Sequence, residues 1–482
     1  MKRTKLWITD QWVEGSRTVP LTNPHTGEVL AEIGYASPAQ AELAINAAAQ
    51  AYDAFREMPI HQRSAILFRV ARIIERRHEE AAQLIAAEAA KPIKSARGEI
   101  NRTIQTYELS AEAAKNLYGE VIPMDAVPRG ENHTAYVTRQ PLGVVSAITP
   151  FNFPSNLVAH KVGPAIAAGN TIVLKPAEKT PLSSLFLAEV FLEAGLPAGV
   201  LNIIPGDGKE LSDVLTTHDK VAFITFTGSP RVGKIIRAQA GLRKVTLELG
   251  SNSPLLIDRG FNENELDHIA GETATGAFSY NGQVCISIQR VYVHSSIYDD
   301  FVLRLVKKAE SLKIGNPLDE DTDISALIND ESAQRLKTWL DHAVAGGAKI
   351  ASGGKFDKNV MYPTVLTDVP ANTELNCEEA FGPIVTVTSF ERWEDAIRMA
   401  NDSKFGLNAG VFTKDIQRAF KAAKQLQTGG VLINEIPTFR VDHMPYGGVK
   451  DSGTGREGVR YAMEDMMELK LISFRTGVYE DD

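Results

Sequence analysis

The chain has 482 residues, of which 44% are hydrophobic and 23% are charged, and its formal net charge is −9. This length exceeds what one small core needs, so two or three domains are expected. The negative charge disfavours nucleic acid and anionic membranes as partners, and no apolar run reaches the roughly 20 residues of a membrane span. The N-terminus lacks the apolar core of a signal peptide. Two cysteines exclude a disulfide framework and favour a reducing, cytoplasmic setting.

Apolar stripes predict helices over residues 39–117, and from residue 140 strands and helices alternate. This alternation predicts a mainly parallel sheet with helices on both faces. The expected strands are 144–148, 171–174, 200–204, 222–226 and 244–249, and the expected helices are 155–168, 182–194, 208–216 and 231–240. A second alternating set, from 254 to about residue 450, has strands at 254–257, 290–293, 384–390, 409–413 and 430–434.

Two segments stand apart from these alternating sets. Residues 120–141 predict an extended hairpin, and residues 467–476 predict a lone strand after the last helix. A strand of this kind is an exposed edge, which usually pairs with a partner.

Cys285 is the most informative residue, because it lies in a glycine-containing segment, Asn281-Gly-Gln-Val-Cys285, between a predicted helix and an apolar strand. Glu248 closes another predicted strand, and Asn152 lies between phenylalanines after a third. Thiol, carboxylate and amide together provide a nucleophile, a general base and an oxyanion donor. Taken singly, Cys285 is also compatible with an inert buried thiol, and Glu248 with a paired core carboxylate.

Other motifs are less informative. The segment Gly228-Ser-Pro-Arg-Val-Gly-Lys234 nearly matches a P-loop, but Ile235 stands where that motif needs Ser or Thr to hold magnesium, so ATP chemistry is rejected. A strand followed by a helix N-terminus remains there and is able to accept an anion, although it also fits a plain turn. Acidic neighbours mark Cys377 as structural. No cluster has metal-ligand spacing, so no metal site is expected.

Seven short motifs occur in order along the chain. They are Phe151-Asn-Phe-Pro154, Lys175-Pro-Ala-Glu178, Phe226-Thr-Gly-Ser229, Leu247-Glu-Leu-Gly250, Gly282-Gln-Val-Cys285, Glu379-Ala-Phe-Gly-Pro383 and Pro445-Tyr-Gly-Gly448. Together they resemble the aldehyde dehydrogenase superfamily over nearly the whole chain. The resemblance implies an α/β fold with a Rossmann-like coenzyme domain (1–119 and 142–252), an α/β catalytic domain (253–453) and a β-hairpin oligomerisation extension (120–141 and 464–482).

The resemblance also implies roles for the catalytic residues. Cys285 would attack the aldehyde carbon, Asn152 would donate to the oxyanion, and Glu248 would activate the water that hydrolyses the thioester. Lys161 matches a family lysine near this relay. Many family members carry a second glutamate shortly after the segment Gly455-Arg-Glu457, and this chain has Arg460 there.

For the cofactor, the resemblance implies NAD, with NADP possible. The implied binding residues are Thr149, Pro150, Phe151, Lys175, Ala177, Glu178, Gly208, Phe226, Thr227, Gly228, Ser229, Val232, Leu249, Gly250, Glu379 and Phe381. Glu178 at the adenosine ribose would repel a 2′-phosphate, so NAD is expected to be preferred over NADP.

The substrate is expected to be a small polar or anionic aldehyde of the lactaldehyde, glyceraldehyde phosphate or sulfolactaldehyde type. Four candidate substrate residues are cationic or become so on protonation: Arg102, His160, Arg440 and His443. Cations that converge on a pocket bind a carboxylate, phosphate or sulfonate, whereas the same residues are equally compatible with solvated or ion-paired positions. A homodimer or homotetramer is expected.

Three alternatives remain at this point. A cofactor-free cysteine hydrolase would use the same thiol without the motifs from Lys175 to Ser229. A CoA-acylating relative usually lacks the glutamate found at Glu248. A catalytically silent structural relative would not need Cys285, Glu248 and Asn152 together.

Overall fold

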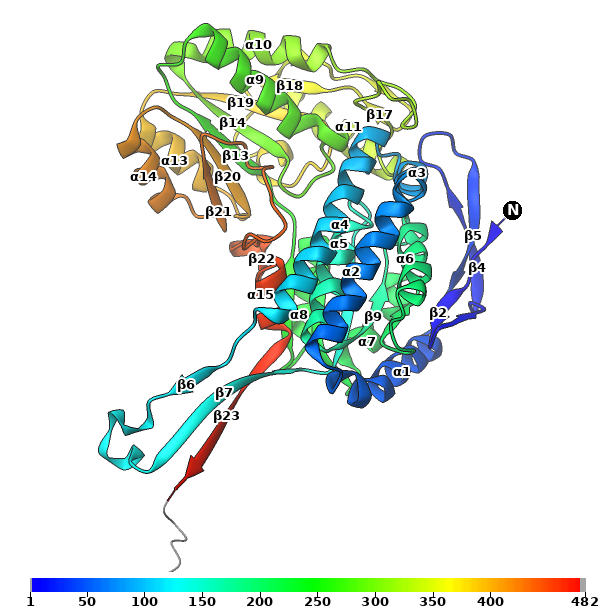
Figure 1. Cartoon of the computed structure of the whole chain (residues 1–482). Coiled ribbons are helices and arrows are strands. Elements are labelled where there is room, and N and C mark those ends of the chain that lie inside the picture. Colours follow the sequence, from blue (N-terminus) through cyan, green and yellow to red (C-terminus); the bar gives the residue numbers. More distant parts are fainter. Residues whose placement is uncertain (1, 477–482) are drawn as a thin grey trace, which may run out of the picture.

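The computed structural model describes residues 2–476, and their helices and strands form two α/β bodies with a slender extension (Figure 1). The expected α/β architecture is confirmed, and the predicted strands and helices agree with the observed ones within a few residues. Nothing is described for residues 477–482, which end the predicted oligomerisation segment.

The first body is built on a sheet of eight strands among the described residues, with the order β22-β12-β11-β8-β9-β10-β2-β3. The five strands from β12 to β10 run parallel, and β22 and β2 pair antiparallel at either side. The strands are β2 (Leu6–Ile8), β3 (Gln11–Val13), β8 (Val144–Ile148), β9 (Thr171–Lys175), β10 (Leu201–Ile203), β11 (Val221–Thr227), β12 (Lys244–Glu248) and β22 (Gly453–Thr454).

Helices cover both faces of this sheet, because its strands are apolar on both sides. One face packs against α5 (Asn156–Ala168) and α6 (Pro181–Glu193), with α2 (Ile60–Arg76), α3 (His78–Ala89) and α4 (Ile93–Lys115) beyond them. The other face packs against α1 (Pro38–Arg56), α7 (Gly208–Thr217) and α8 (Pro230–Gln239). The helix α15 (Val459–Asp465) returns to α5 and α4, so residues that the sequence analysis assigned to no domain join this body.

The second body contains a sheet with the order β15-β18-β19-β14-β13-β20-β21, in which only β15 is antiparallel among the described strands. Its strands are β13 (Ser253–Ile257), β14 (Ile288–His294), β15 (Lys349–Ser352), β18 (Thr364–Thr367), β19 (Ile384–Phe390), β20 (Asn408–Phe412) and β21 (Gly430–Ile433). The helices α9 (Glu263–Phe278) and α10 (Tyr298–Glu310) pack on one face, and α13 (Trp393–Asn401) and α14 (Ile416–Gln425) on the other. The helix α11 (Asp330–Ala345) has its own apolar cluster.

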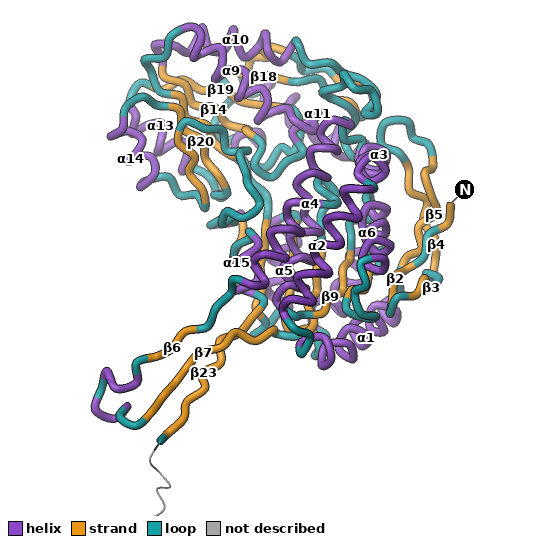
Figure 2. The backbone as a smooth tube through the Cα atoms, in the orientation of Figure 1, coloured by secondary structure: helices purple, strands orange, loops and turns teal. Residues whose placement is uncertain are grey.

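The extension is a three-stranded antiparallel sheet of β6 (Glu120–Ile122), β7 (His133–Pro141) and β23 (Met467–Arg475). It projects away from both bodies (Figures 1 and 2). The predicted hairpin is confirmed, and the C-terminal strand pairs along the whole of β7, so its partner lies within the same chain.

The sequence analysis did not anticipate the N-terminal strands. The strands β1 (Lys2–Arg3), β4 (Arg17–Thr22) and β5 (Val29–Tyr35) form a small separate sheet, while β2 and β3 extend the first sheet. The strands β1, β2 and β3 have two or three residues each, and β4 is mostly exposed or half-buried, so the sequence carries little apolar alternation there.

Candidate active site

Cys285 lies on a loop between the end of α9 and β14, and it lines a cavity to which both bodies contribute. Three consecutive residues on this loop adopt left-handed backbone conformations: Tyr280 (φ 48°), Asn281 (φ 55°) and Gly282 (φ 67°). A Cβ on Gly282 would lie 2.1 Å from the carbonyl oxygen of Gly382, so only glycine fits at that position.

The strained residues are held in place by buried hydrogen bonds. The Tyr280 hydroxyl donates to the Ala89 carbonyl at 3.0 Å. The Asn281 side chain donates to the Ala326 carbonyl at 2.7 Å and accepts from the Ser325 N–H at 2.8 Å. These contacts over-determine an unfavourable backbone, as is common at functional sites.

Cys285 lines a cavity of about 250 Å³. Both bodies contribute to the lining, which comprises Arg102, Phe153, Asn156, Leu157, Thr275, Gly276, Ser279, Val284, Cys285, Ile286, Thr438, Arg440 and Tyr446. The thiol sulfur lies 2.9 Å from the Tyr446 hydroxyl. Burial raises the pKa of the Cys285 thiol to about 11, while the hydrogen bond to Tyr446 and the charge of Arg440 act in the opposite direction.

Asn152 lies on the loop between β8 and α5. Its side-chain N–H donates to the carbonyl oxygen of Gln283 at 3.0 Å, which holds the amide against the loop that carries Cys285. The side chain is buried, and its carbonyl oxygen has no hydrogen-bond partner in the described part of the chain. An amide nitrogen carries two N–H groups, so one remains free to donate to an oxyanion near the sulfur.

Glu248 ends β12 and is buried, and neither of its carboxylate oxygens has a hydrogen-bond partner within residues 2–476. Burial and the nearby charge of Glu457 raise its pKa well above the ordinary value. A Cβ on Gly447 would lie 2.7 Å from one of these oxygens, so the glycine leaves room beside the carboxylate. A buried carboxyl without a structural partner is a candidate acid or base.

Lys161 lies on α5 and is fully buried, and its ammonium group donates to the Glu457 carboxylate and the Thr225 hydroxyl, each at 3.0 Å. Burial alone would raise the pKa of Glu457, but Lys161 and Arg440 lower it to about 2. The glutamate that lies beside Lys161 is therefore Glu457. Arg460 is exposed and pairs with Glu464 at 3.1 Å, so the substitution noted in the sequence does not affect this site.

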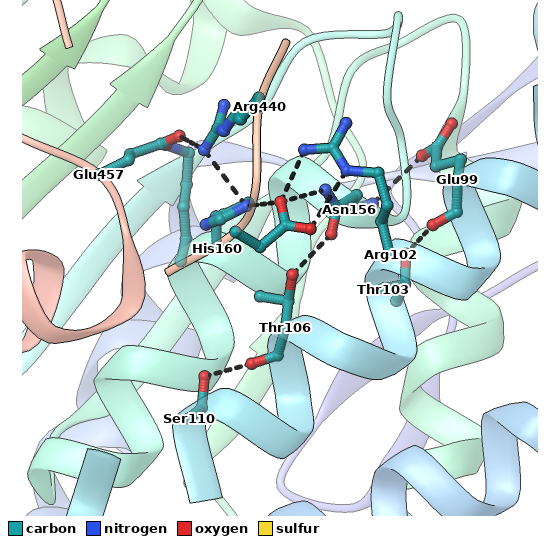
Figure 3. A network of polar contacts seen from close by, with 11 residues as sticks. Glu99, Arg102, Thr103, Thr106, Ser110, Asn156, His160, Arg440 and Glu457 are labelled. Carbon is teal, nitrogen blue, oxygen red and sulfur yellow. Dashed lines mark hydrogen bonds and ion pairs between the residues drawn. The ribbon is translucent and has the colours of Figure 1, made fainter. Parts of the chain in front are cut away.

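Arg440 is buried and connects two groups of the site. Its guanidinium donates to the Glu457 carboxylate at 3.1 Å and lies 3.2 Å from the His160 imidazole nitrogen. The same guanidinium lies over the Tyr446 ring, with its central carbon 3.7 Å from the ring centroid. Figure 3 shows Glu457, Arg440 and His160 in contact with one another.

Asp442, which the sequence analysis did not single out, joins the other candidate substrate residues. Arg102 donates two hydrogen bonds to its carboxylate, at 2.6 and 3.1 Å, and Asn156 and His160 approach the same carboxylate at 3.2 and 2.8 Å. Burial alone would raise the pKa of Asp442, but bonds to His160 and Arg102 hold it far below its usual range. Burial and the charge of Arg440 lower the pKa of His160.

The structure thus separates the four candidate substrate residues. Arg102 and Arg440 line the cavity, and His160 is buried beside Asp442. His443 is exposed and lies outside the cavity lining. No periodic pattern marks Asp442, because it lies on a loop and its partners Arg102 and His160 are more than 280 residues away in the sequence.

The predicted cofactor residues gather at one edge of the first sheet. The carboxyl ends of β8, β9, β11 and β12 meet there. From β8 the chain adds β9 and β10 on one side of the sheet and then β11 and β12 on the other, so the order of addition reverses between β8 and β11. Ligands of open parallel sheets bind outside such a reversal point. Thr149, Pro150 and Phe151 follow β8, Ala177 follows β9, Phe226, Thr227 and Gly228 end or follow β11, and Leu249 follows β12.

Specific groups at this edge fit a dinucleotide. The N-termini of α7 and α8 begin there, at Gly208 and after Ser229, whose side chain accepts from the Val232 N–H at 3.4 Å. Such helix ends bind phosphates. The buried Thr227 hydroxyl has no hydrogen-bond partner in the described region.

The two carboxylates that the resemblance assigns to the ribose groups are held by contacts at this edge. Glu178 accepts from Lys175 at 2.7 Å and from the Gly208 N–H at 2.8 Å. Glu379 accepts from the Ser251 N–H at 2.9 Å, and a Cβ on Gly250 would lie 2.4 Å from its other oxygen.

Phe381 is placed beside the loop after β8, because its ring meets that of Phe151 edge to face with centroids 5.8 Å apart.

Within the described region no helix has the length and apolar character needed to cross a membrane, and no group of three His, Cys, Asp or Glu residues is arranged to hold a metal.

Comparison with known proteins identifies the class. The aldehyde dehydrogenase family matches residues 12–472. The chain is 44% identical to a 3-sulfolactaldehyde dehydrogenase of Priestia aryabhattai over 98% of both chains. It is similar to the structure of aldehyde dehydrogenase 21 from Physcomitrella patens in complex with the reaction product succinate, with TM-score 0.96 and 40% identity over 99% of both chains. It is also similar to a glyceraldehyde-3-phosphate dehydrogenase from Methanocaldococcus jannaschii complexed with NADP, with TM-score 0.92 and 40% identity over 96% of this chain and 100% of that one.

The chain belongs to the aldehyde dehydrogenase family. It is an oxidoreductase that oxidises an aldehyde to the carboxylic acid with NAD(P)+. The expected preference for NAD over NADP stays a prediction, which the ratio of catalytic efficiencies with the two cofactors would test.

Proposed function

We propose that this protein oxidises a small polar or anionic aldehyde, of the lactaldehyde, glyceraldehyde phosphate or sulfolactaldehyde type, through a covalent intermediate on Cys285. The position of the thiol in a cavity shared by both bodies, on a loop whose Gln283 carbonyl accepts a hydrogen bond from Asn152, carries the proposal. The names of the similar 3-sulfolactaldehyde and glyceraldehyde-3-phosphate dehydrogenases support the substrate class.

In the proposed mechanism the Cys285 thiolate attacks the aldehyde carbon, and the carbonyl electron pair moves onto oxygen. The free N–H of Asn152 and the backbone N–H of Cys285 stabilise this oxyanion. Bound NAD(P)+ supplies the hydride acceptor. The collapse of the oxyanion then leaves a thioester on Cys285.

Hydrolysis requires a base, and we assign this role to Glu248 because its oxygens have no structural partner. Glu248 takes a proton from water as the hydroxide equivalent attacks the thioester carbon, which expels the Cys285 sulfur and releases the acid. Lys161 keeps the neighbouring Glu457 ionised, and that negative charge raises the pKa of Glu248, which makes the ionised Glu248 carboxylate a stronger base.

The experiment that tests the nucleophile compares two thiols. Cys285→Ala should abolish aldehyde oxidation while NAD still binds in a calorimetric titration. Cys377→Ala is the matched control, because Cys377 is exposed and does not line the cavity that holds Cys285, and it should keep nearly full activity. Near-normal turnover by Cys285→Ala would refute the assignment. Turnover without NAD would favour the hydrolase alternative, and CoA-dependent product would favour the acylating one.

The charges around the cavity support an anionic substrate. The lowered pKa values of Asp442 and Glu457 favour their ionised forms, whereas the lowered pKa of His160 and the raised pKa of Glu248 favour the neutral forms of those two groups. The cations that face the two ionised carboxylates are Lys161, Arg102 and Arg440. Arg102 and Arg440 both line the cavity, so an anionic group of the substrate would meet positive charge there.

A matched pair of substrates tests this charge. Arg102→Gln should raise KM for succinate semialdehyde about 10- to 100-fold, because a hydrogen bond to a charged group is lost. KM for the neutral amide of the same shape, 4-oxobutanamide, should change little. His443→Ala, on the same loop as Arg440 but exposed, should change neither. An equal effect of Arg102→Gln on both substrates would contradict an anion site.

We also propose that the protein acts as a homodimer or homotetramer in the cytoplasm. Exposed apolar side chains on the extension, among them Val121, Leu469, Leu471 and Phe474, support assembly through this element. The two cysteines are both free, which suits a reducing compartment.

A further inference from the structure

Tyr446 belongs to the motif Pro445-Tyr-Gly-Gly448, to which no chemical role has been assigned. The ring is buried, with 2% of the residue exposed, and its hydroxyl lies 2.9 Å from the Cys285 sulfur. Within residues 2–476 the hydroxyl has no other hydrogen-bond partner. The backbone is fixed as well, because Tyr446 and Glu457 exchange two backbone hydrogen bonds, at 3.0 and 2.7 Å. The hydroxyl is therefore held against the sulfur by a rigid loop.

The surroundings decide which atom donates. The Arg440 guanidinium lies 3.7 Å from the Tyr446 ring centroid, and a cation over the ring withdraws electron density and makes the hydroxyl a better donor. Burial, together with the neighbouring Cys285, raises the pKa of the hydroxyl well above its ordinary value, so it keeps its proton at neutral pH. A thiol is a weak donor, whereas a thiolate only accepts.

We propose that Tyr446 is a catalytic residue whose hydroxyl donates a hydrogen bond to the Cys285 thiolate and thereby favours the reactive, ionised form of that sulfur. The proposal rests on Cys285 being the nucleophile of the proposed function.

This bond compensates for a cost that the cavity imposes. Burial and the nearby charges of Glu379 and Glu248 disfavour the thiolate, whereas the charge of Arg440 favours it. Cys285 has no imidazole or ammonium group among its described hydrogen-bond partners. When the sulfur attacks a carbon it loses its negative charge, and the bond to Tyr446 weakens. The bond thus stabilises the sulfur more before the attack than after it. Its effect is to increase the fraction of Cys285 that is present as the thiolate when the aldehyde binds.

The test measures the thiol directly and needs no aldehyde. In the full-length Cys377→Ser protein Cys285 is the one remaining thiol, since the sequence holds two cysteines. The rate of alkylation by iodoacetamide, in which the thiolate displaces iodide, is followed against pH. Tyr446→Phe in this background should raise the midpoint by about one to two pH units, the shift expected when a hydrogen bond to a charged group is lost.

Tyr298→Phe is the matched control, because it removes a hydroxyl that donates to the Val387 carbonyl at 3.2 Å in the second body. Its midpoint should equal that of the parent. An unchanged or lower midpoint for Tyr446→Phe would overturn the proposal, because it would mean that the thiol donates to the tyrosine or that the contact has no effect.

A second measurement covers the case in which Tyr446→Phe does not fold. Replacing Tyr446 by 3-fluorotyrosine keeps the shape and makes the hydroxyl a stronger donor. The alkylation midpoint should then fall, and a rise would overturn the proposal. If Cys285→Ala retains aldehyde oxidation, the proposed function fails, while the alkylation midpoint still reports whether Tyr446 donates to the sulfur.

Discussion

Cys285 and Glu248 share a physical problem at the residue scale: both react in their ionised forms, and burial raises the pKa of each. The solutions differ. The thiol has one hydroxyl partner at 2.9 Å, whereas the carboxyl has no hydrogen-bond partner among the described residues. The hydrogen bond from Tyr446 favours the thiolate and so suits the first step, the attack on the aldehyde. The carboxyl of Glu248 has no such bond and suits the second step, the activation of water.

Glu248→Gln should separate these two steps. The glutamine cannot accept a proton from water, so hydrolysis of the thioester should slow by roughly 100-fold or more, the range of a general base. Hydride transfer precedes this step and should be nearly unchanged. Stopped-flow recording of NADH should therefore show a fast burst followed by a slow steady state.

Two observations would argue against that role. A burst that is lost in proportion to the steady state would place Glu248 in an earlier step. The pH profile gives an independent check: the raised pKa of Glu248 predicts that wild-type hydrolysis increases as pH rises through that value, and the variant should lack this increase.

At the scale of elements, two buried carboxylates of the outer helices bind the N-termini of the inner helices α5 and α6. Glu99 accepts from the Ser155 and Asn156 N–H groups, at 2.8 and 3.1 Å, where α5 begins just after Asn152. Glu88 accepts from the Leu182 and Ser183 N–H groups, at 2.8 and 3.0 Å, where α6 begins. These bonds satisfy donors that a helix leaves free, and they fix the helix that carries Lys161 and His160.

Glu88→Gln should change how stability depends on pH. Burial raises the pKa of Glu88 from the ordinary 4.5 to about 8, so the folded protein holds a proton that the unfolded chain has lost between these values. The stability contributed by Glu88 is complete below the unfolded pKa and is lost as pH rises through about 8. Glutamine does not ionise and should remove this dependence.

Urea unfolding of both proteins at several pH values measures the difference. As the pH rises, the free energy of unfolding of the wild type should fall relative to that of Glu88→Gln. The fall should be about 1.4 kcal/mol for each unit by which the pKa of Glu88 in the folded protein exceeds that in the unfolded chain. Parallel stability curves would show that the pKa of Glu88 is not raised.

At the scale of the whole molecule, the extension is the element with the least support from its own chain. Leu469, Leu471 and Phe474 are each more than half exposed, and the sheet stands away from both bodies (Figure 1). A three-stranded sheet with apolar side chains in water is stabilised when a second chain covers them.

Leu471→Lys should therefore weaken the assembly, because a charge would replace an apolar side chain in the proposed contact. Light scattering after gel filtration should show a lower mass than for the wild type at equal concentration. Leu303→Lys on α10 is the matched control: Leu303 is 54% exposed and Leu471 58%, but Leu303 lies on the second body. An unchanged mass for Leu471→Lys would mean that subunits meet elsewhere.

The sequence by itself determined most elements of both parallel sheets, since buried parallel strands are continuous apolar runs that alternate with amphipathic helices. It also marked Cys285, Glu248 and Asn152, because a thiol, a carboxylate and an amide at the ends of elements are chemically unusual there. The N-terminal strands were missed, since short strands with mixed exposure carry no clear period.

Only the tertiary structure decided how the charged side chains combine. Arg102 and Asp442 are 340 residues apart in sequence, and Lys161 and Glu457 are 296 apart. Each ion pair forms because a helix of the first body, α4 or α5, packs against a loop that follows β21 of the second body. No local sequence pattern predicts this contact. The exposed position of His443 and the contact between Tyr446 and the thiol have the same origin: a side chain on a loop takes its direction from what the loop packs against, which the residues beside it in the sequence do not specify.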